Sequence, residues 1–185
     1  MKQFLYLFLF ISFISISNSN SAKQLEISSA DIKQGKKISE HHVFNGFGCS
    51  GENVFPQISW KNAPKETKSF ALTVYDPDAP TGSGWWHYNL VNIPVKYNDL
   101  PAGFSKDDKF VIEDEMLQVR NDFGAYKFGG PCPPKGDKPH RYFFTVYALK
   151  TDKLDIPESA TSAYAGFMIR QNSIAKAELI ATYGR

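Results

Sequence analysis

The sequence predicts an all-β-dominated domain, an antiparallel β-sandwich with a few short peripheral helices. Aromatic residues, which favour β-strands, make up 15% of the chain. The 13 glycines and 11 prolines supply many turns. Short runs of strand-like composition alternate with loops rich in glycine and proline, and one segment near the C-terminus has helical spacing.

The composition excludes two broad classes of protein. With 42% hydrophobic residues and a formal net charge of +2, the 185-residue chain does not match a wholly disordered protein, which needs low hydrophobicity and a strong charge imbalance. Its 21 basic and 19 acidic residues provide no basic excess of the kind that a nucleic-acid-binding surface requires. The length fits one folded domain.

Residues 1–22 are predicted to be a secretory signal peptide. Lys2 precedes an apolar run from Phe4 to Ile16, and the small, polar stretch SNSNSA follows, which is the order found in export signals. The alternative, a transmembrane anchor, needs about 20 apolar residues, more than this run contains. We expect a periplasmic or secreted protein without a stable membrane anchor, with a single domain over residues 23–185. The expected cleavage positions follow Ser19, Ser21 or Ala22.

The two cysteines, Cys49 and Cys132, are predicted to form a disulfide. An even number of cysteines in an exported chain is typical of such a bond. Two buried thiols and a metal site are the alternatives. Neither cysteine has a second cysteine or a histidine at the spacing of a zinc site, so no metal is expected.

The first half of the domain is predicted to hold three strands, each followed by turn-forming residues. Residues 43–51 (VFNGFGCSG) are rich in glycine, and residues 76–84 (DPDAPTGSG) consist of turn formers throughout. Proline at position 94 ends the third strand. The predicted strands are Leu25–Ile27, Ser69–Tyr75 and Trp86–Ile93.

The second half is predicted to combine long loops, two strands and one helix. Residues 94–110 and 124–139 are read as loops, and residues 118–123 have no clear preference. The run HRYFFTVYAL at His140–Leu149 is apolar on both faces after its first residues, which predicts a strand covered on both sides. Apolar residues at helical spacing predict a helix at Ser159–Arg170, and Ile174–Tyr183 is interpreted as a strand rather than a second helix.

Polar residues gather at the ends of these strands. His140 and Tyr142 are two residues apart in one strand, so their side chains share a face, as do those of Trp85 and His87. Asp76 follows directly after another strand. If the three strands are neighbours, these side chains meet at one end of the sheet.

Such a cluster is suited to binding a small anion. Protonated imidazoles, a phenol hydroxyl and the backbone N–H groups of Gly129 and Gly130 donate hydrogen bonds to phosphate or carboxylate oxygens. An aspartate beside a histidine fixes its tautomer and favours the cation. The alternative is that each residue is structural, with the aspartates capping turns and the histidines satisfying buried backbone groups.

Two longer blocks resemble the signature blocks of the phosphatidylethanolamine-binding protein family, in its bacterial Raf-kinase-inhibitor-like branch. They are TVYDPDAPTGSGWWHYNLVNIP at 73–94 and GGPCPPKGDKPHRYFFTVYAL at 129–149. The similarity extends over nearly all of residues 23–185 and includes HVFNGFGCSGENVFPQISW at 42–60. The resemblance implies a Greek-key sandwich, a homodimer, and a pocket for phosphate-like anions and phosphorylated head groups.

The resemblance also assigns the pocket residues one by one. Cys132 stands where the eukaryotic motif has glycine, and exported bacterial members resemble this chain in carrying the same cysteine pair. The predicted ligand-binding residues are Asp76, Asp78, Pro80, Trp85, His87, Gly130, Cys132, His140 and Tyr142.

Three functions are compatible with these observations. The first is a non-catalytic exported protein that binds a small phosphorylated or anionic ligand, with no cofactor. The second is an interaction protein that inhibits or modulates a kinase, a protease or a host signalling protein outside the cell. The third is a hydrolase that uses His87 or His140 as a base. No nucleophile or metal set accompanies these histidines in the sequence, so we expect no enzyme activity.

Overall fold

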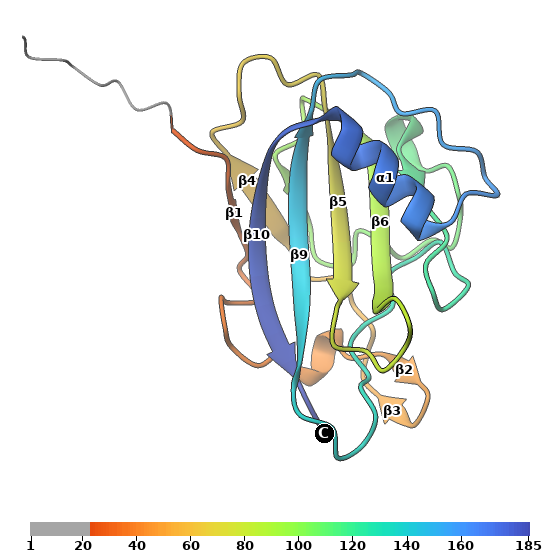
Figure 1. Ribbon diagram of the computed structural model, residues 1–185. Helices are drawn as coiled ribbons and strands as arrows, with labels where there is room; N and C mark the ends of the chain where they lie inside the picture. The colour runs from red at the N-terminus through yellow and green to blue at the C-terminus, as the bar shows by residue number, and fades with distance from the viewer. Residues whose placement is uncertain (1–22) are drawn as a thin grey trace, which may run out of the picture.

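The computed structural model describes residues 23–185. The predicted signal peptide, residues 1–22, lies outside the described residues. A five-stranded antiparallel sheet in the order β10-β9-β5-β6-β8 forms the larger layer (Figure 1). Its strands are β5 (Ser69–Asp76), β6 (Trp85–Pro94), β8 (Leu117–Gln118), β9 (His140–Leu149) and β10 (Ser173–Tyr183).

A smaller three-stranded sheet packs behind the larger one. It joins β1, β4 and β7 in that order, all antiparallel, and a separate hairpin joins β2 to β3. The bounds are β1 (Glu26–Ser28), β2 (Asn45–Gly46), β3 (Cys49–Ser50), β4 (Ile58–Lys61) and β7 (Asp99–Leu100). The predicted antiparallel sandwich is therefore confirmed.

The main core lies between the two sheets. Strand alternation supplies it: Leu72 and Val74 of β5 and Phe144 and Val146 of β9 are almost fully buried and face Trp60 of β4 across the core. The order of the large sheet is the Greek-key arrangement that the resemblance implies. Among β5, β6, β8 and β9, the last in chain order lies beside the first.

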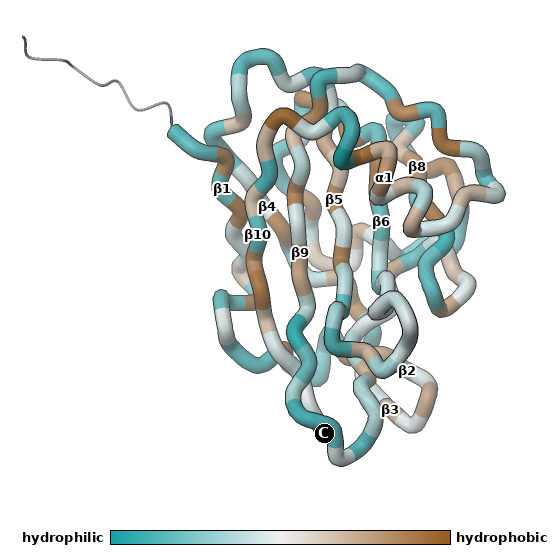
Figure 2. The backbone as a smooth tube through the Cα atoms, viewed as in Figure 1, coloured by the Kyte–Doolittle hydropathy of each residue, from teal (hydrophilic) through white to brown (hydrophobic). Residues whose placement is uncertain are grey.

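One α-helix, α1 (Ser162–Asn172), crosses the outer face of the large sheet (Figure 1). It closes a second core cluster together with Leu154 and Ile156 of the preceding segment. In Figure 2 the segment that leads into α1 has brown, hydrophobic positions among teal, hydrophilic ones. Two single-turn helices, η1 (Glu40–His42) and η2 (Glu113–Glu115), complete the structure.

The long strands, the helix and the short strand β1 were predicted within a few residues, and the other short strands were missed. Strands β4, β7 and β8 have between two and four residues, too few for a periodic pattern. Helix α1 begins at Ser162 instead of Ser159, because the Thr161 hydroxyl accepts a hydrogen bond from the Tyr164 N–H and caps the first turn. The glycine-rich stretch 43–51 contains the β2–β3 hairpin.

The prediction that β9 is covered on both faces was only half right. Its inward face is buried, whereas the outward side chains of Phe143 and Tyr147 are partly exposed and Arg141 is exposed. Helix α1 is too short to cover the whole outer face, so these aromatic rings line an open groove. Within residues 23–185, the structure contains no helix long and apolar enough to cross a membrane.

Candidate functional site

A small cavity of about 130 Å³ lies at the end of the large sheet where β5 finishes and β6 and β9 begin. Asp76 pairs with Trp85 across β5 and β6, and Tyr75 next to it pairs with Phe143 of β9. The antiparallel register therefore brings the predicted strand ends together. The cavity is lined by Phe47, Asp76, Ala79, Pro80, Trp85, His87, Phe123, Cys132, Pro133, Pro134, His140 and Tyr142.

The carboxylate of Asp76 organises one wall of this cavity. Its Oδ2 atom lies 2.8 Å from His140 Nδ1, and both side chains are buried. Its Oδ1 atom accepts hydrogen bonds from the N–H groups of Asp78 and Ala79. Asp76 thus shapes the turn after β5 and orients the imidazole of His140, as the sequence predicted. The second ring nitrogen of His140, Nε2, lies 3.6 Å from the carboxylate of Asp137.

His87 is held by the 129–132 loop and differs from the prediction. Its Nδ1 atom lies 2.6 Å from the carbonyl oxygen of Gly129, which only accepts, so Nδ1 carries the proton. Burial lowers the pKa of His87 to about 4, although the Gly129 carbonyl and the charge of Asp76 act in the opposite direction. The prediction of a protonated imidazole is therefore wrong for His87, because complete burial outweighs its partners.

Three buried polar atoms around the cavity have no hydrogen-bond partner: Trp85 Nε1, His87 Nε2 and the Tyr142 hydroxyl. Buried polar groups are almost always paired, so such atoms mark a site that a ligand or water completes. All three residues line the same cavity. Burial, and then the charge of Asp76, raises the pKa of Tyr142, which keeps this hydroxyl protonated as a donor.

Two predicted site residues do not line the cavity. Asp78 turns outward, where its carboxylate accepts from Arg141 Nε at 2.8 Å and Nη2 at 2.7 Å; this pairing lowers its pKa. The N–H of Gly130 donates to the Asn53 side chain at 2.7 Å. The N–H of Gly129 donates to the His87 carbonyl at 3.0 Å. The predicted loop amides are therefore already engaged within the protein.

Gly130 has a structural reason to be glycine. A Cβ atom at this position would lie 2.0 Å from the carbonyl oxygen of His42, inside any permitted contact distance. The loop 129–132 packs directly against the segment 42–44, where the Phe44 N–H donates to the Pro131 carbonyl at 3.1 Å. This close approach fixes the wall on which His87 rests.

The rim of the cavity was missed at the sequence level. Phe123 stacks on Phe44 with ring centroids 4.3 Å apart, and it meets Trp85 and His87 edge-on at 5.3 Å each. Phe47 stands at the mouth and is 68% exposed. The sequence pointed to Phe47 only through its position in the glycine-rich stretch 43–51, because a phenylalanine in a loop is not part of a periodic hydrophobic pattern.

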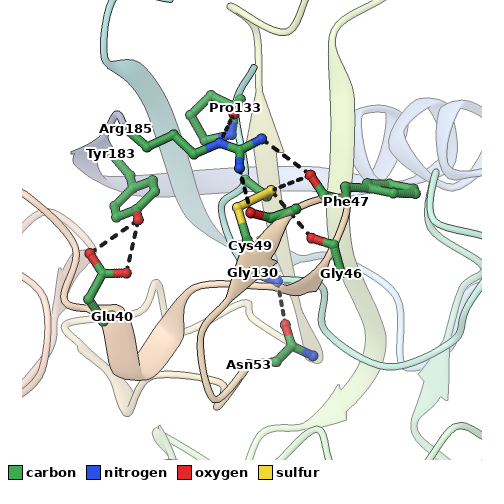
Figure 3. The surroundings of a disulfide bond; sticks show 11 residues. Glu40, Gly46, Phe47, Cys49, Asn53, Gly130, Pro133, Tyr183 and Arg185 are labelled. Atoms are coloured by element: carbon green, nitrogen blue, oxygen red, sulfur yellow. Dashed lines mark hydrogen bonds between the residues drawn. A yellow bond between two sulfur atoms is a disulfide. The ribbon is translucent and has the colours of Figure 1, made fainter. Parts of the chain in front are cut away.

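A disulfide between Cys49 and Cys132 joins the two loops at the mouth, as predicted. Arg185 adds a second tie (Figure 3). Its guanidinium donates to the carbonyls of Gly48 at 2.7 Å and Phe47 at 3.2 Å, and its Nε donates to that of Pro133 at 2.7 Å. These contacts hold the strand-end loop 129–139 and the β2–β3 hairpin in one position.

A larger groove of about 670 Å³ lies on the outer face of the large sheet beside α1. Aromatic rings of Tyr75, Trp86, Phe143 and Tyr147 form part of its lining. Among residues 23–185, none of the buried polar atoms without a partner lies in this groove. The small cavity is therefore the stronger candidate for a specific ligand, because of the two hollows it is the one whose lining residues carry buried polar atoms without a partner.

Comparisons with known proteins agree with the geometry. The family model described as phosphatidylethanolamine-binding protein matches residues 28–184. The chain is 49% identical to the UPF0098 protein YbcL of Escherichia coli over 162 residues, which are 88% of each chain. It is 44% identical to the UPF0098 protein YbhB of the same organism over 159 residues, 86% of this chain and 99% of the relative.

Solved structures show the same architecture. The crystal structure of Escherichia coli YbcL, described as a new member of the mammalian PEBP family, aligns with a TM-score of 0.84 at 48% identity, over 88% of this chain and 99% of the other. The Chlamydia trachomatis protein CT736, described as a putative PEBP homolog, aligns with a TM-score of 0.72 at 28% identity, over 88% of this chain and 98% of the other.

Proposed function

The chain belongs to the phosphatidylethanolamine-binding protein family, and on that premise we propose that it is an exported, non-catalytic protein that binds small phosphate-like anions or phosphorylated head groups. The observation that carries the proposal is the set of three unpartnered polar atoms, on Trp85, His87 and Tyr142, around one cavity. A phosphoryl group offers several oxygens at short range, which can accept from Trp85 Nε1–H and the Tyr142 hydroxyl at once, while a P–O–H group can donate to His87 Nε2.

The size of the cavity supports a small ligand group. Its volume is about 130 Å³. Drug-sized ligands occupy about 300–1,000 Å³. The cavity therefore suits a phosphoryl group, while the remainder of the ligand would extend past Phe47 toward solvent.

The lining supports binding rather than chemistry. Its cysteine, Cys132, is in a disulfide, and the carboxylate of Asp76 already accepts three hydrogen bonds within the protein. No serine, threonine or lysine lines the cavity among residues 23–185. The serine, threonine, lysine and cysteine nucleophiles are thus absent or engaged there.

Export follows from the predicted signal peptide and is supported by the disulfide. Disulfides persist in oxidising compartments and are rare in the cytosol. The Cys49–Cys132 bond therefore fits a periplasmic or secreted protein. Detection of the chain in the periplasmic or medium fraction, lacking residues 1–22, is the expected outcome, and retention of the full-length chain in the cytosol would contradict it.

The binding proposal is tested by titrating residues 23–185 with phosphorylethanolamine while following backbone and Trp85 indole NMR signals. We expect shifts at Trp85, His87 and His140. The His140→Ala variant should lose about 1.5–3 kcal/mol of binding free energy, the range for a hydrogen bond to a charged group.

His41→Ala is the matched control, since His41 is an exposed histidine whose partner is Glu52, outside the cavity. This variant should bind as the wild type does. Unchanged affinity of His140→Ala, or an absence of shifts at millimolar ligand in the wild type, would refute the pocket.

One observation favours the alternative function, the modulation of a protein partner. Apolar side chains are exposed beside the outer groove, at Tyr164 and Phe167 of α1 and at Ile174 at the start of β10. Exposed apolar patches are typical of interaction surfaces. The homodimer that the family resemblance implies also stays a prediction, which analytical ultracentrifugation of residues 23–185 would check.

A further inference from the structure

The tautomer of His87 determines what the cavity offers to a ligand. Because Nδ1–H donates to the Gly129 carbonyl at 2.6 Å, the neutral ring presents an acceptor, Nε2, as its remaining hydrogen-bonding group. That atom is buried and unpartnered, and it belongs to a residue that lines the cavity. An oxyanion without a proton also carries only acceptors. One of its oxygen atoms would therefore face His87 Nε2 with no proton between the two acceptor atoms.

A second acceptor on the same cavity strengthens the argument. Asp76 also lines the cavity, and its carboxylate accepts hydrogen bonds from His140 and the 78–79 backbone. Trp85 Nε1–H and the Tyr142 hydroxyl are the unpartnered donors. The cavity therefore combines donors with acceptors, a pattern that matches an oxyanion bearing both bare oxygens and an O–H group.

We propose that this cavity selects oxyanions that carry a proton, with His87 Nε2 accepting the ligand's O–H while Trp85 and Tyr142 donate to its bare oxygens. The proposal rests on the anion-binding function proposed above and specifies its ligand class. Inorganic phosphate and the monoanion of a phosphomonoester meet this requirement. Sulfate and phosphodiesters, which have no proton near neutral pH, do not.

The charged and titratable groups around His87 fit this assignment. Asp76 of β5 favours a proton on the ring, whereas His140 of β9 disfavours it. Tyr142 of β9 touches the ring edge-on, with centroids 5.2 Å apart, and stays neutral. Phe123 and the 129–130 backbone complete the surroundings without a further charge. Burial dominates this balance, so the ring is neutral in the unliganded protein.

A proton-free anion would have to bind together with a proton taken up by His87. The pKa of this ring is about 4, about 3 pH units below a working pH of about 7. Protonating the ring at that pH would therefore lower the affinity for a proton-free anion by a factor of about 10³. A ligand that brings its own proton avoids this factor. The structure thus predicts a large, pH-dependent difference between two oxyanions of the same size and shape.

Isothermal titration calorimetry with phosphate and sulfate tests the proposal directly, since both are tetrahedral and differ mainly in protonation. At about pH 7 we expect sulfate to bind at least about a hundredfold more weakly than phosphate. Sulfate affinity should rise by about tenfold per pH unit as the pH falls toward 4, with one proton taken up per bound anion, measured in buffers of different ionisation enthalpy.

Esters extend the test to the source of the phosphoryl group. Glycerophosphoethanolamine, a diester, should behave like sulfate. Phosphorylethanolamine, a monoester, has a second pKa of about 6, so its affinity should fall as the pH rises above that value. A diester that binds as tightly as the monoester near neutral pH, without proton uptake, would overturn the proposal.

The His87→Gln variant assigns the selectivity to this ring. The glutamine amide presents an N–H donor as well as an acceptor. The affinity for phosphate should therefore exceed that for sulfate by no more than about tenfold. His41→Gln, at an exposed histidine outside the cavity, should leave the ratio unchanged. Full selectivity in His87→Gln would overturn the role of His87.

The outcomes separate this proposal from the binding function on which it rests. Equal binding of phosphate and sulfate at about pH 7, without proton uptake, would leave the anion site standing and refute proton selection. Binding of neither anion would refute both. If His87→Gln fails to fold, the comparison of the two anions on the unaltered protein still decides the question.

Discussion

Two histidines of the same cavity are held in different ways. His140 donates to a carboxylate, whereas His87 donates to a neutral carbonyl and is completely buried. At the residue level, the partner of the ring nitrogen decides what the ring can do. In the sequence each histidine stands near the start of a predicted strand, which does not distinguish the two.

The buried, neutral state of His87 predicts how stability depends on pH. Its pKa is about 4 in the folded protein and about 6.5 in the unfolded chain, so the unfolded chain binds more protons between these values. The free energy of unfolding is therefore highest above about pH 6.5, where the ring is neutral in both states, and it decreases as the pH falls toward 4. The loss amounts to about 3 kcal/mol.

Urea unfolding of the wild type and of His87→Gln between about pH 7 and 4 checks this prediction. The wild-type free energy of unfolding should fall more steeply than that of the variant, since only the wild type has this ring to protonate. Parallel curves for the two proteins would contradict the burial argument. The test is made without phosphate, because a ligand that binds the folded state would change the slope.

At the scale of elements, α1 shows how a short helix depends on its cap. The helix is 11 residues long and starts where the Thr161 hydroxyl accepts from the Tyr164 N–H at 3.2 Å. Isolated helices of this length are marginal in water, so packing and capping must hold it. Its buried side, with Ala165 and Ile169, closes the outer core cluster.

Thr161→Ala should therefore lower the free energy of unfolding by about 1 kcal/mol, within a range of about 0.5–2 kcal/mol for lost N-caps. Thr161→Ser retains a hydroxyl and should stay close to the wild type. Denaturant unfolding measures both variants. Binding of phosphate should be unaffected, because the helix lies on the outer face of the sheet and none of its residues lines the small cavity. A Thr161→Ala protein as stable as the wild type would show that the cap is dispensable.

At the scale of the whole molecule, the mouth of the cavity is built from segments far apart in the chain. The Cys49–Cys132 disulfide spans 83 positions, and Arg185 contacts both loops that this bond joins. Strands β5, β6 and β9 carry the polar groups of the cavity, while the disulfide and the hydrogen bonds of Arg185 hold its rim in place. Stability and pocket shape are thus coupled at this end of the sandwich.

Replacing both cysteines with serine should destabilise the protein by about 2–4 kcal/mol, the typical range for a native disulfide. The expected signature is a lower denaturant midpoint, and the wild type under reducing conditions should move in the same direction. Phosphate affinity should also fall, since the 129–139 loop loses one of its two ties to the β2–β3 hairpin. A double variant with unchanged midpoint and affinity would contradict the rim's role.

The sequence determined the elements that have strong local signals. Strand β9 was predicted with its bounds intact, because its centre, Tyr142–Tyr147, consists entirely of β-forming residues. The motif residues Asp76, Trp85, His87, His140 and Tyr142 were also found, and all of them line the cavity. The two-residue strands β7 and β8 were not found, because hydrogen bonds to distant strands create them.

Only the tertiary structure decided which polar groups remain available at the site. Asp78 lies two residues from Asp76, yet it turns outward to Arg141, and the amide of Gly130 is taken by Asn53. Whether His87 is charged depends on how completely the chain buries it. Residue types and spacing fix which groups the strands bring to one place, but pairing and burial arise from segments far apart in the sequence. The chemical character of the cavity is therefore a property of the folded molecule.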